Sequence, residues 1–213
     1  MDTALRSVFA ALALHGAAVA CIAVSDAHAF SIELRAADPG RIERQRQYAL
    51  RPPEPDNIEP PVANIAARLT ELGARDGAPV FIRLFKATSE LELWVATADR
   101  FMLYKRYRIC FWSGRLGPKL SEGDGQTPEG FYTITRRQLH WSHRWARSLN
   151  LGFPNLFDRR HGRTGSNILI HGGCSSTGCL SMTNRRVSEI HYLVRSALRH
   201  GQRRVHVHAF PFR

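Results

Sequence analysis

Residues 168–182, with the sequence ILIHGGCSSTGCLSM, decide the fold and the chemistry expected of this chain. The β-prone run at 168–170 leads directly to His171, and Cys179 follows after a turn of small residues. A cysteine nucleophile needs a nearby imidazole that accepts the thiol proton and later protonates the leaving amine. We therefore expect Cys179 to be the nucleophile and His171 the general base and acid of a covalent mechanism.

The turn between these two residues consists mainly of Gly, Ser and Thr. Glycine permits tight backbone turns, which would bring the two side chains together. N–H groups in such a turn can face a developing oxyanion. We expect Ser176 and Gly178 to shape this turn, and the N–H groups around Gly178 and Cys179 to be the oxyanion donors.

Taken together, these residues resemble a known family signature: His171-Gly172, Ser176-Thr177-Gly178-Cys179, Leu180 and Met182. The signature is similar to that of the L,D-transpeptidase catalytic domain, also called the YkuD domain, and the resemblance covers residues 80–213. It implies an α+β, predominantly β fold, with a YkuD-like mixed β-sheet core and a few packed helices. It also implies a thioester formed with a peptidoglycan stem peptide, with no cofactor and no metal.

Two departures from the commonest pattern resemble the YafK-type branch of that family. Ser181 stands where most members carry Arg, and the separation between His171 and Cys179 is short. Three further segments support this branch, namely 117–119 (GPK), 122–132 (EGDGQTPEGFY) and 161–166 (HGRTGS). The resemblance implies hydrolysis at meso-diaminopimelate that releases a peptidoglycan-bound lipoprotein. The alternative is an L,D-transpeptidase that forms cross-links or peptidoglycan–protein links, in cell wall biogenesis and cell shape.

Cationic groups lie immediately before the expected catalytic strand, at 158–163. Because Ser181 replaces the usual arginine, Arg163 is the candidate for holding a substrate carboxylate, which a guanidinium can grip with two hydrogen bonds. A solvated basic turn is the alternative. His161 and Tyr132, within the family-like segments, are the further candidates for substrate binding.

The N-terminal region has the pattern of a secretory signal peptide at 1–29, with an apolar run followed by Ala27-His28-Ala29. Export to the periplasm is the expectation, with no stable membrane span; lipidation of Cys21 is the alternative. Residues 30–78 read as a proline-rich arm or linker, with one amphipathic helix at 62–72 that docks on the domain. The catalytic domain is expected at 79–213.

Export leaves three cysteines in the mature chain, Cys110, Cys174 and Cys179. Since the compartment is oxidising, one thiol stays free or pairs outside the chain. We expect Cys179 to be the free one. A Cys110–Cys174 disulfide, two buried thiols, and a Cys174–Cys179 bridge that would inactivate the enzyme reversibly all remain open.

Composition admits other functions. The 213-residue chain carries a formal net charge of +12, which calls for an acidic partner or surface. Nucleic acid fits this charge, but the arginines are scattered through strands and loops, so we expect a peptidoglycan partner and possible attached lipoprotein, and no nucleic acid. A zinc module built on His171, Cys174 and Cys179 is a second alternative, although its spacing is loose.

Hydrophobic patterning predicts the framework around the motif. Strands are expected at 80–86, 91–97, 101–112, 131–134 and 204–210. A helix is expected from Thr183 to His200, with one apolar stripe and Gly201 as its stop. If Cys179 lies near the start of this helix, the helix dipole would favour the thiolate. Residues 114–130 are expected to form a long loop, which is either a solvated connection or a segment that approaches the substrate. Residues 138–147 are either a lid or a partly buried surface loop.

Overall fold

The structure is a computed structural model that describes residue 38 and residues 40–51, 60–140 and 147–213. The expected signal peptide at 1–29, the lipidation alternative at Cys21 and most of the expected lid at 138–147 lie outside these residues. None of the helices in the described part has the length and apolar character needed to span a membrane. The compact unit considered below runs from Leu34 to Arg213.

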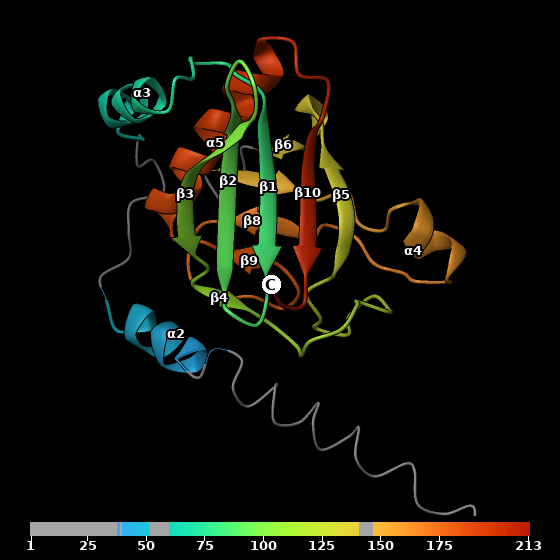
Figure 1. Cartoon of the computed structure of the whole chain (residues 1–213). Coiled ribbons are helices and arrows are strands. Elements are labelled where there is room, and N and C mark those ends of the chain that lie inside the picture. Colours follow the sequence, from blue (N-terminus) through green and yellow to red (C-terminus); the bar gives the residue numbers. More distant parts are fainter. Residues whose placement is uncertain (1–37, 39, 52–59, 141–146) are drawn as a thin grey trace, which may run out of the picture. The chain divides into compact units, whose positions relative to one another are not determined.

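Two five-stranded sheets form the body of this unit (Figure 1). The first sheet has the order β3-β2-β1-β10-β5 and the second the order β4-β9-β8-β7-β6. Each is mixed, because β1 pairs with β10 in parallel and β8 pairs with β9 in parallel. The strands are β1 (Val80–Phe85), β2 (Glu90–Ala96), β3 (Phe101–Arg108), β4 (Phe111–Trp112), β5 (Gly130–Ile134), β6 (Leu139–His140), β7 (Ser148–Asn150), β8 (Leu169–His171), β9 (Leu180–Ser181) and β10 (Val205–Phe210).

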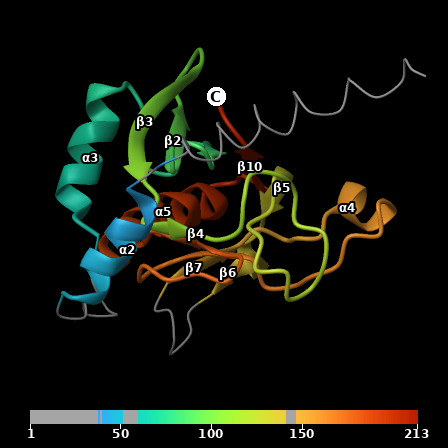
Figure 2. The ribbon, with the colours of Figure 1, turned by 90° about the horizontal axis from the view of Figure 1, so that it is seen from below.

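Helix α5 (Asn184–Arg199) contacts strands of both sheets, namely β1 of the first and β7 and β8 of the second. Figure 2 shows it between the two layers. Its predicted apolar stripe is buried, with Ile190, Val194 and Ala197 at 0% exposure. The remaining helices are α2 (Arg41–Ala49), α3 (Val62–Glu71) and α4 (Leu156–Arg160), with a 3-10 turn, η1, at Arg136–Gln138. The α+β class and mixed sheets are confirmed, with about equal helix and strand content in the described residues.

The predicted strand at 101–112 is divided between the two sheets. β3 ends at Arg108 and β4 begins at Phe111. Between them the N–H of Ile109 donates to Ser89 O and the N–H of Cys110 donates to Ser181 O. The chain therefore crosses from one sheet to the other without leaving a backbone donor unpaired at the crossing, which periodicity alone did not reveal.

The arm contributes more than the one docking helix expected at 62–72. Helix α3 does dock, through the buried Ile65 and Leu69. The segment before it is also attached, because the carboxylate of Asp38 accepts hydrogen bonds from Arg44, Ser89 and Arg108. In addition, the Arg41 guanidinium carbon lies 3.9 Å from the centroid of the Trp112 ring.

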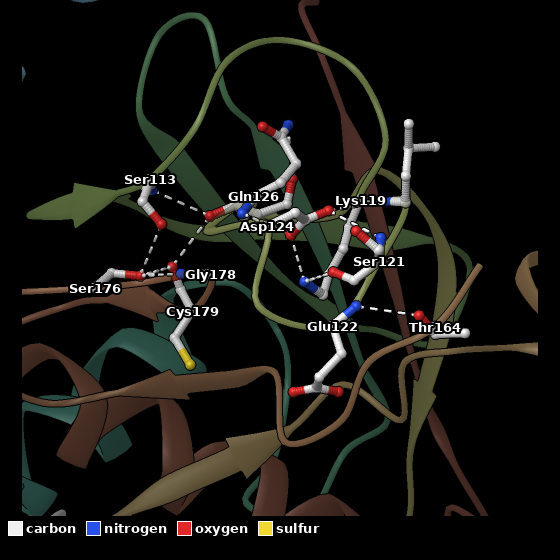
Figure 3. Close-up of polar contacts among 12 residues, drawn as sticks. Ser113, Lys119, Ser121, Glu122, Asp124, Gln126, Thr164, Ser176, Gly178 and Cys179 are labelled. Atoms are coloured by element: carbon white, nitrogen blue, oxygen red, sulfur yellow. Dashed lines mark hydrogen bonds and ion pairs between the residues drawn. The ribbon is translucent and has the colours of Figure 1, made fainter.

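The long loop at 114–130 is ordered by buried polar side chains. Lys86, 0% exposed, donates to Gly117 O and Thr127 O and pairs with Glu129 at 2.9 Å. The carboxylate of Asp124 accepts from Lys119 and from three backbone N–H groups, those of Leu120, Ser121 and Gln126 (Figure 3). A loop without regular secondary structure thus has fixed partners for its backbone.

A disulfide joins Cys110 to Cys174, and both residues are buried beside Phe111 and Tyr48. Of the alternatives that the sequence left open, this pairing is the one observed. Cys179 is the free cysteine of the described residues, as expected. The bridge closes a loop with a sequence separation of 64 and ties the strand crossing to the motif turn.

Replacing both Cys110 and Cys174 by Ala should lower the free energy of unfolding by about 4 kcal/mol, because the loop closed by the bridge then gains its full entropy in the unfolded chain. Urea unfolding of the oxidised protein measures the change. Reductant should lower the urea midpoint of the unaltered chain to that of the double variant. Cys179→Ala is the matched control, because it removes a cysteine outside the bridge. Equal stability of the double variant and the parent would contradict a stabilising bridge.

The hydrogen bonds to Asp124 lower the pKa of its carboxyl to about 2, against the opposing effect of burial. A carboxyl with a depressed folded-state pKa stabilises the fold above its unfolded value near 4 and loses that contribution as pH falls through 2. Because Asp124 is exposed and solvent screens its interactions, we expect Asp124→Asn to cost about 1 kcal/mol at pH 6 and little at pH 2. Urea unfolding between these pH values tests this. Asp99→Asn, on the exposed turn between β2 and β3, is the control. Its effect on the free energy of unfolding should be the same at both pH values.

Candidate active site

The parallel pairing of β8 and β9 brings the two predicted catalytic residues together. Ile170 lies opposite Leu180 and His171 opposite Ser181. Continued back by one residue, this register places Cys179 beside Leu169, whose N–H donates to Cys179 Sγ at 3.3 Å. Since alternate residues of a strand face one side, His171 and Cys179 share a side, with Cα atoms roughly 8 Å apart by strand spacing.

The histidine ring is buried and oriented by the backbone. His171 is 2% exposed, and its Nδ1 lies 2.6 Å from Gly172 O. A carbonyl oxygen only accepts, so this contact assigns the proton to Nδ1 in the neutral ring. Nε2 is then the nitrogen with the lone pair, which is the tautomer that a general base requires.

The start of helix α5 holds the turn that follows His171. Asn184 Oδ1 accepts from Gly173 N–H at 2.9 Å, and Thr183 N–H donates to Gly173 O. A Cβ on Gly172 would lie 2.1 Å from Asn184 Oδ1, so only glycine fits there. Thr183 occupies the N-cap position, as expected, but its side chain makes no capping hydrogen bond. The sequence alone did not indicate this role of Asn184, because the role depends on a tertiary contact.

Two hydroxyl groups donate to the backbone of Cys179, and a third contacts one of them (Figure 3). The carbonyl oxygen of Cys179 accepts from Ser176 Oγ at 2.6 Å and from Thr127 Oγ1 at 3.2 Å. Ser113 Oγ lies 3.5 Å from Ser176 Oγ. In the figure the sulfur points away from these hydroxyls. The loop at 114–130 therefore reaches the site through Thr127, a contact that the sequence alone did not indicate.

The N–H of Gly178 has a partner within the turn. It donates to Ser176 Oγ at 3.1 Å, so Ser176 bonds both to this N–H and to Cys179 O. Ser176 and Gly178 thus shape the turn. The expected use of the Gly178 N–H as an oxyanion donor needs a correction, because in this conformation the group is engaged by Ser176. The N–H of Cys179 itself remains the candidate donor.

Burial raises the pKa of the Cys179 thiol above its ordinary value. The N–H of Leu169 and the charge of Lys119 act in the opposite direction. The expected help from the helix dipole is not the arrangement observed: α5 begins at Asn184, after β9, and the amide at the sulfur belongs to Leu169. The thiol is therefore protonated at neutral pH and depends on a base.

The three predicted substrate-binding residues form a second group around α4. Tyr132 is 2% exposed and its hydroxyl donates to Asp158, which places it in the core and not on a binding surface. Arg163 also donates to Asp158, at 2.8 Å. His161 is exposed at the end of α4, with Nδ1 2.9 Å from Phe157 O. These contacts tie all three to Asp158 and Phe157, not to the Cys179 turn.

The zinc alternative loses one of its ligands in this structure. Cys174 is bonded to Cys110, so it is not a thiolate that could join His171 and Cys179 on a metal. Within the described residues, no three His, Cys, Asp or Glu side chains gather in a way that could hold an ion.

Comparison with known proteins gives one family. The model of the L,D-transpeptidase catalytic domain, YkuD, matches residues 88–207. The L,D-transpeptidase-type protein YafK of Escherichia coli K12 is 45% identical over 137 residues, which is 64% of this chain and 56% of that protein. YafK of E. coli O157:H7 gives the same values. The chain thus spans little more than half the length of these relatives.

Solved structures agree at the level of the fold. A mutant form of the helical cell shape determining protein Pgp2 from Campylobacter jejuni superposes with a TM-score of 0.52 at 22% identity, over 68% of this chain and 54% of that one. Unmutated Pgp2 from the same organism superposes with a TM-score of 0.50 at 21% sequence identity, over 70% of this chain and 56% of that one. With the family model covering more than half of its residues, this chain belongs to the L,D-transpeptidase catalytic domain (YkuD) family.

Proposed function

We propose that the chain is a periplasmic cysteine acyl-enzyme that cleaves peptidoglycan stem peptides at meso-diaminopimelate and releases an attached lipoprotein. The observation that carries this proposal is the β8–β9 register, which sets a protonated thiol one strand away from an imidazole whose Nδ1 is held by Gly172 O. Similarity to YafK over 137 residues supports the choice of branch. The signal-peptide pattern at 1–29 supports the location.

The chemistry follows from these groups. His171 Nε2 takes the thiol proton as Cys179 Sγ bonds to the carbonyl carbon of the scissile amide. The C–N bond then breaks, the leaving amine receives that proton, and a thioester remains. Water, deprotonated by His171, attacks the thioester, which frees the carboxylate and restores the thiol. If an amine attacks in place of water, the product is a new amide, which is the transpeptidase alternative.

The acyl acceptor can be identified directly. The protein is incubated in H2¹⁸O with sacculi that carry covalently bound lipoprotein, and the fragments are analysed by mass spectrometry. Hydrolysis places ¹⁸O in the carboxylate of the cleaved stem. Unlabelled amide products with a new amine would instead assign the transpeptidase reaction.

Cys179→Ala should lower turnover by more than about 1000-fold, because the nucleophile is lost. His171→Gln should have a comparable effect and should also slow alkylation of Cys179 by iodoacetamide near neutral pH, since the base that accepts the thiol proton is absent. Circular dichroism and urea unfolding establish that both variants are folded. Turnover retained by folded Cys179→Ala would remove the proposed mechanism.

Ser176→Ala and Thr127→Ala should each lower kcat about tenfold with KM nearly unchanged, since each removes one hydrogen bond that fixes the Cys179 carbonyl. Steady-state kinetics on a soluble stem-peptide substrate measures the effect. Thr127→Ser keeps the hydroxyl and is the matched control, expected to retain most of the activity. A rise in KM at constant kcat would assign these hydroxyls to substrate binding and not to positioning.

A further inference from the structure

Arginines line two neighbouring hollows at the end of helix α5 far from the motif. One hollow, of about 200 Å³, is lined by Arg136, Arg195 and Arg199 together with Leu139. The other, of about 570 Å³, shares Arg136 and adds Arg137 and Arg203. No carboxylate is among the described residues that line either one.

The C-terminus of α5 explains the presence of only one of these arginines. Cations are favourable at a helix C-terminus, where backbone carbonyls lack partners. Arg136 already meets this need, because its Nε donates to Leu198 O and its Nη2 to Arg199 O. Arg137 and Arg203 lie outside the helix and are exposed. Like charges gathered within a Debye length repel one another, so the cluster costs stability unless an anion offsets it.

We propose that this surface, defined by Arg136, Arg137, Arg195, Arg199 and Arg203 and here named the arginine surface, docks on an anionic lipid bilayer through the phosphates of its headgroups. Guanidinium groups bind phosphate oxygens with paired hydrogen bonds. Three exposed members, Arg137, Arg199 and Arg203, are spread over the two adjoining hollows and match several headgroups side by side, which a bilayer presents and a single small anion does not.

The position of the surface relative to the site fits this occupant. The first turn of α5 holds the catalytic turn through Asn184, and its last residues line the arginine surface. Sixteen helical residues separate the two ends by about 24 Å. A domain that rests on a membrane by its arginine surface therefore keeps Cys179 away from the lipid.

The test compares two triple variants of equal net charge in the full-length chain. Arg137→Gln/Arg199→Gln/Arg203→Gln removes three exposed members of the surface and leaves Arg136 and Arg195 in place. Arg46→Gln/Arg100→Gln/Arg160→Gln removes three exposed arginines from other parts of the domain. Sedimentation is measured with vesicles of phosphatidylcholine alone and of phosphatidylcholine mixed with phosphatidylglycerol. The difference between the two vesicle types removes any binding that does not depend on lipid charge.

The first triple variant should weaken the charge-dependent binding about 100-fold, and the second should change it little. High salt should abolish the binding of the parent chain. Equal losses in the two triples would show that net charge alone acts and would overturn the proposal. The proposal would also be overturned if the first triple variant lost binding to heparin or DNA while its vesicle binding stayed unchanged. That result would assign the surface to a soluble polyanion. Cys179→Ala should bind vesicles as the parent does, so this result is separate from that of the proposed chemistry.

Discussion

The parallel pairing of β8 with β9 is the constraint on which the rest of the site depends. A shift of one residue in this pairing would move the side chain at 179 to the opposite face from His171. The two strands are short, so their register needs support from outside. Three sets of contacts provide this support: the disulfide at Cys174, the hydrogen bond between Asn184 and Gly173, and the hydroxyl groups that donate to Cys179 O.

Burial of the thiol determines how the site works. Because burial raises the pKa of the Cys179 thiol, the sulfur keeps its proton at neutral pH and the resting protein does not carry a permanently reactive thiolate. The cost is that attack requires a base already aligned. The contact of His171 Nδ1 with Gly172 O orients the ring before substrate arrives.

Much of the framework could be predicted from local pattern. The apolar stripe along α5 and the alternation in β10 reflect burial on one face, so the sequence pattern predicts both elements. The break between β3 and β4 was missed because both halves are apolar and β-prone, and only the pairing partners distinguish them. The attachment of α2 was missed for a similar reason, since it depends on the ion pairs of Asp38 and on Arg41 over Trp112.

In the site, too, some features could be predicted from local sequence and others could not. The identities of Cys179 and His171 follow from chemistry and spacing, whereas their supporting contacts come from residues distant in sequence. Thr127 bonds to the Cys179 carbonyl across a separation of 52 residues. Tyr132 sits in a family-like segment, yet its hydroxyl serves the core through Asp158. A motif thus marks a segment as important without distinguishing binding from support.

Ser181 shows what a departure from the common family pattern means physically. It is 0% exposed, and its Oγ donates to Phe111 O on β4 at 2.9 Å. The side chain at this position therefore links β9 to β4 and carries no charge. The positive charge that acts on the thiol comes instead from Lys119, which is 3% exposed and reaches the site from the loop at 114–130. A cation carried by a loop and balanced by Asp124 can be tuned independently of the β8–β9 register, whereas an arginine within β9 could not.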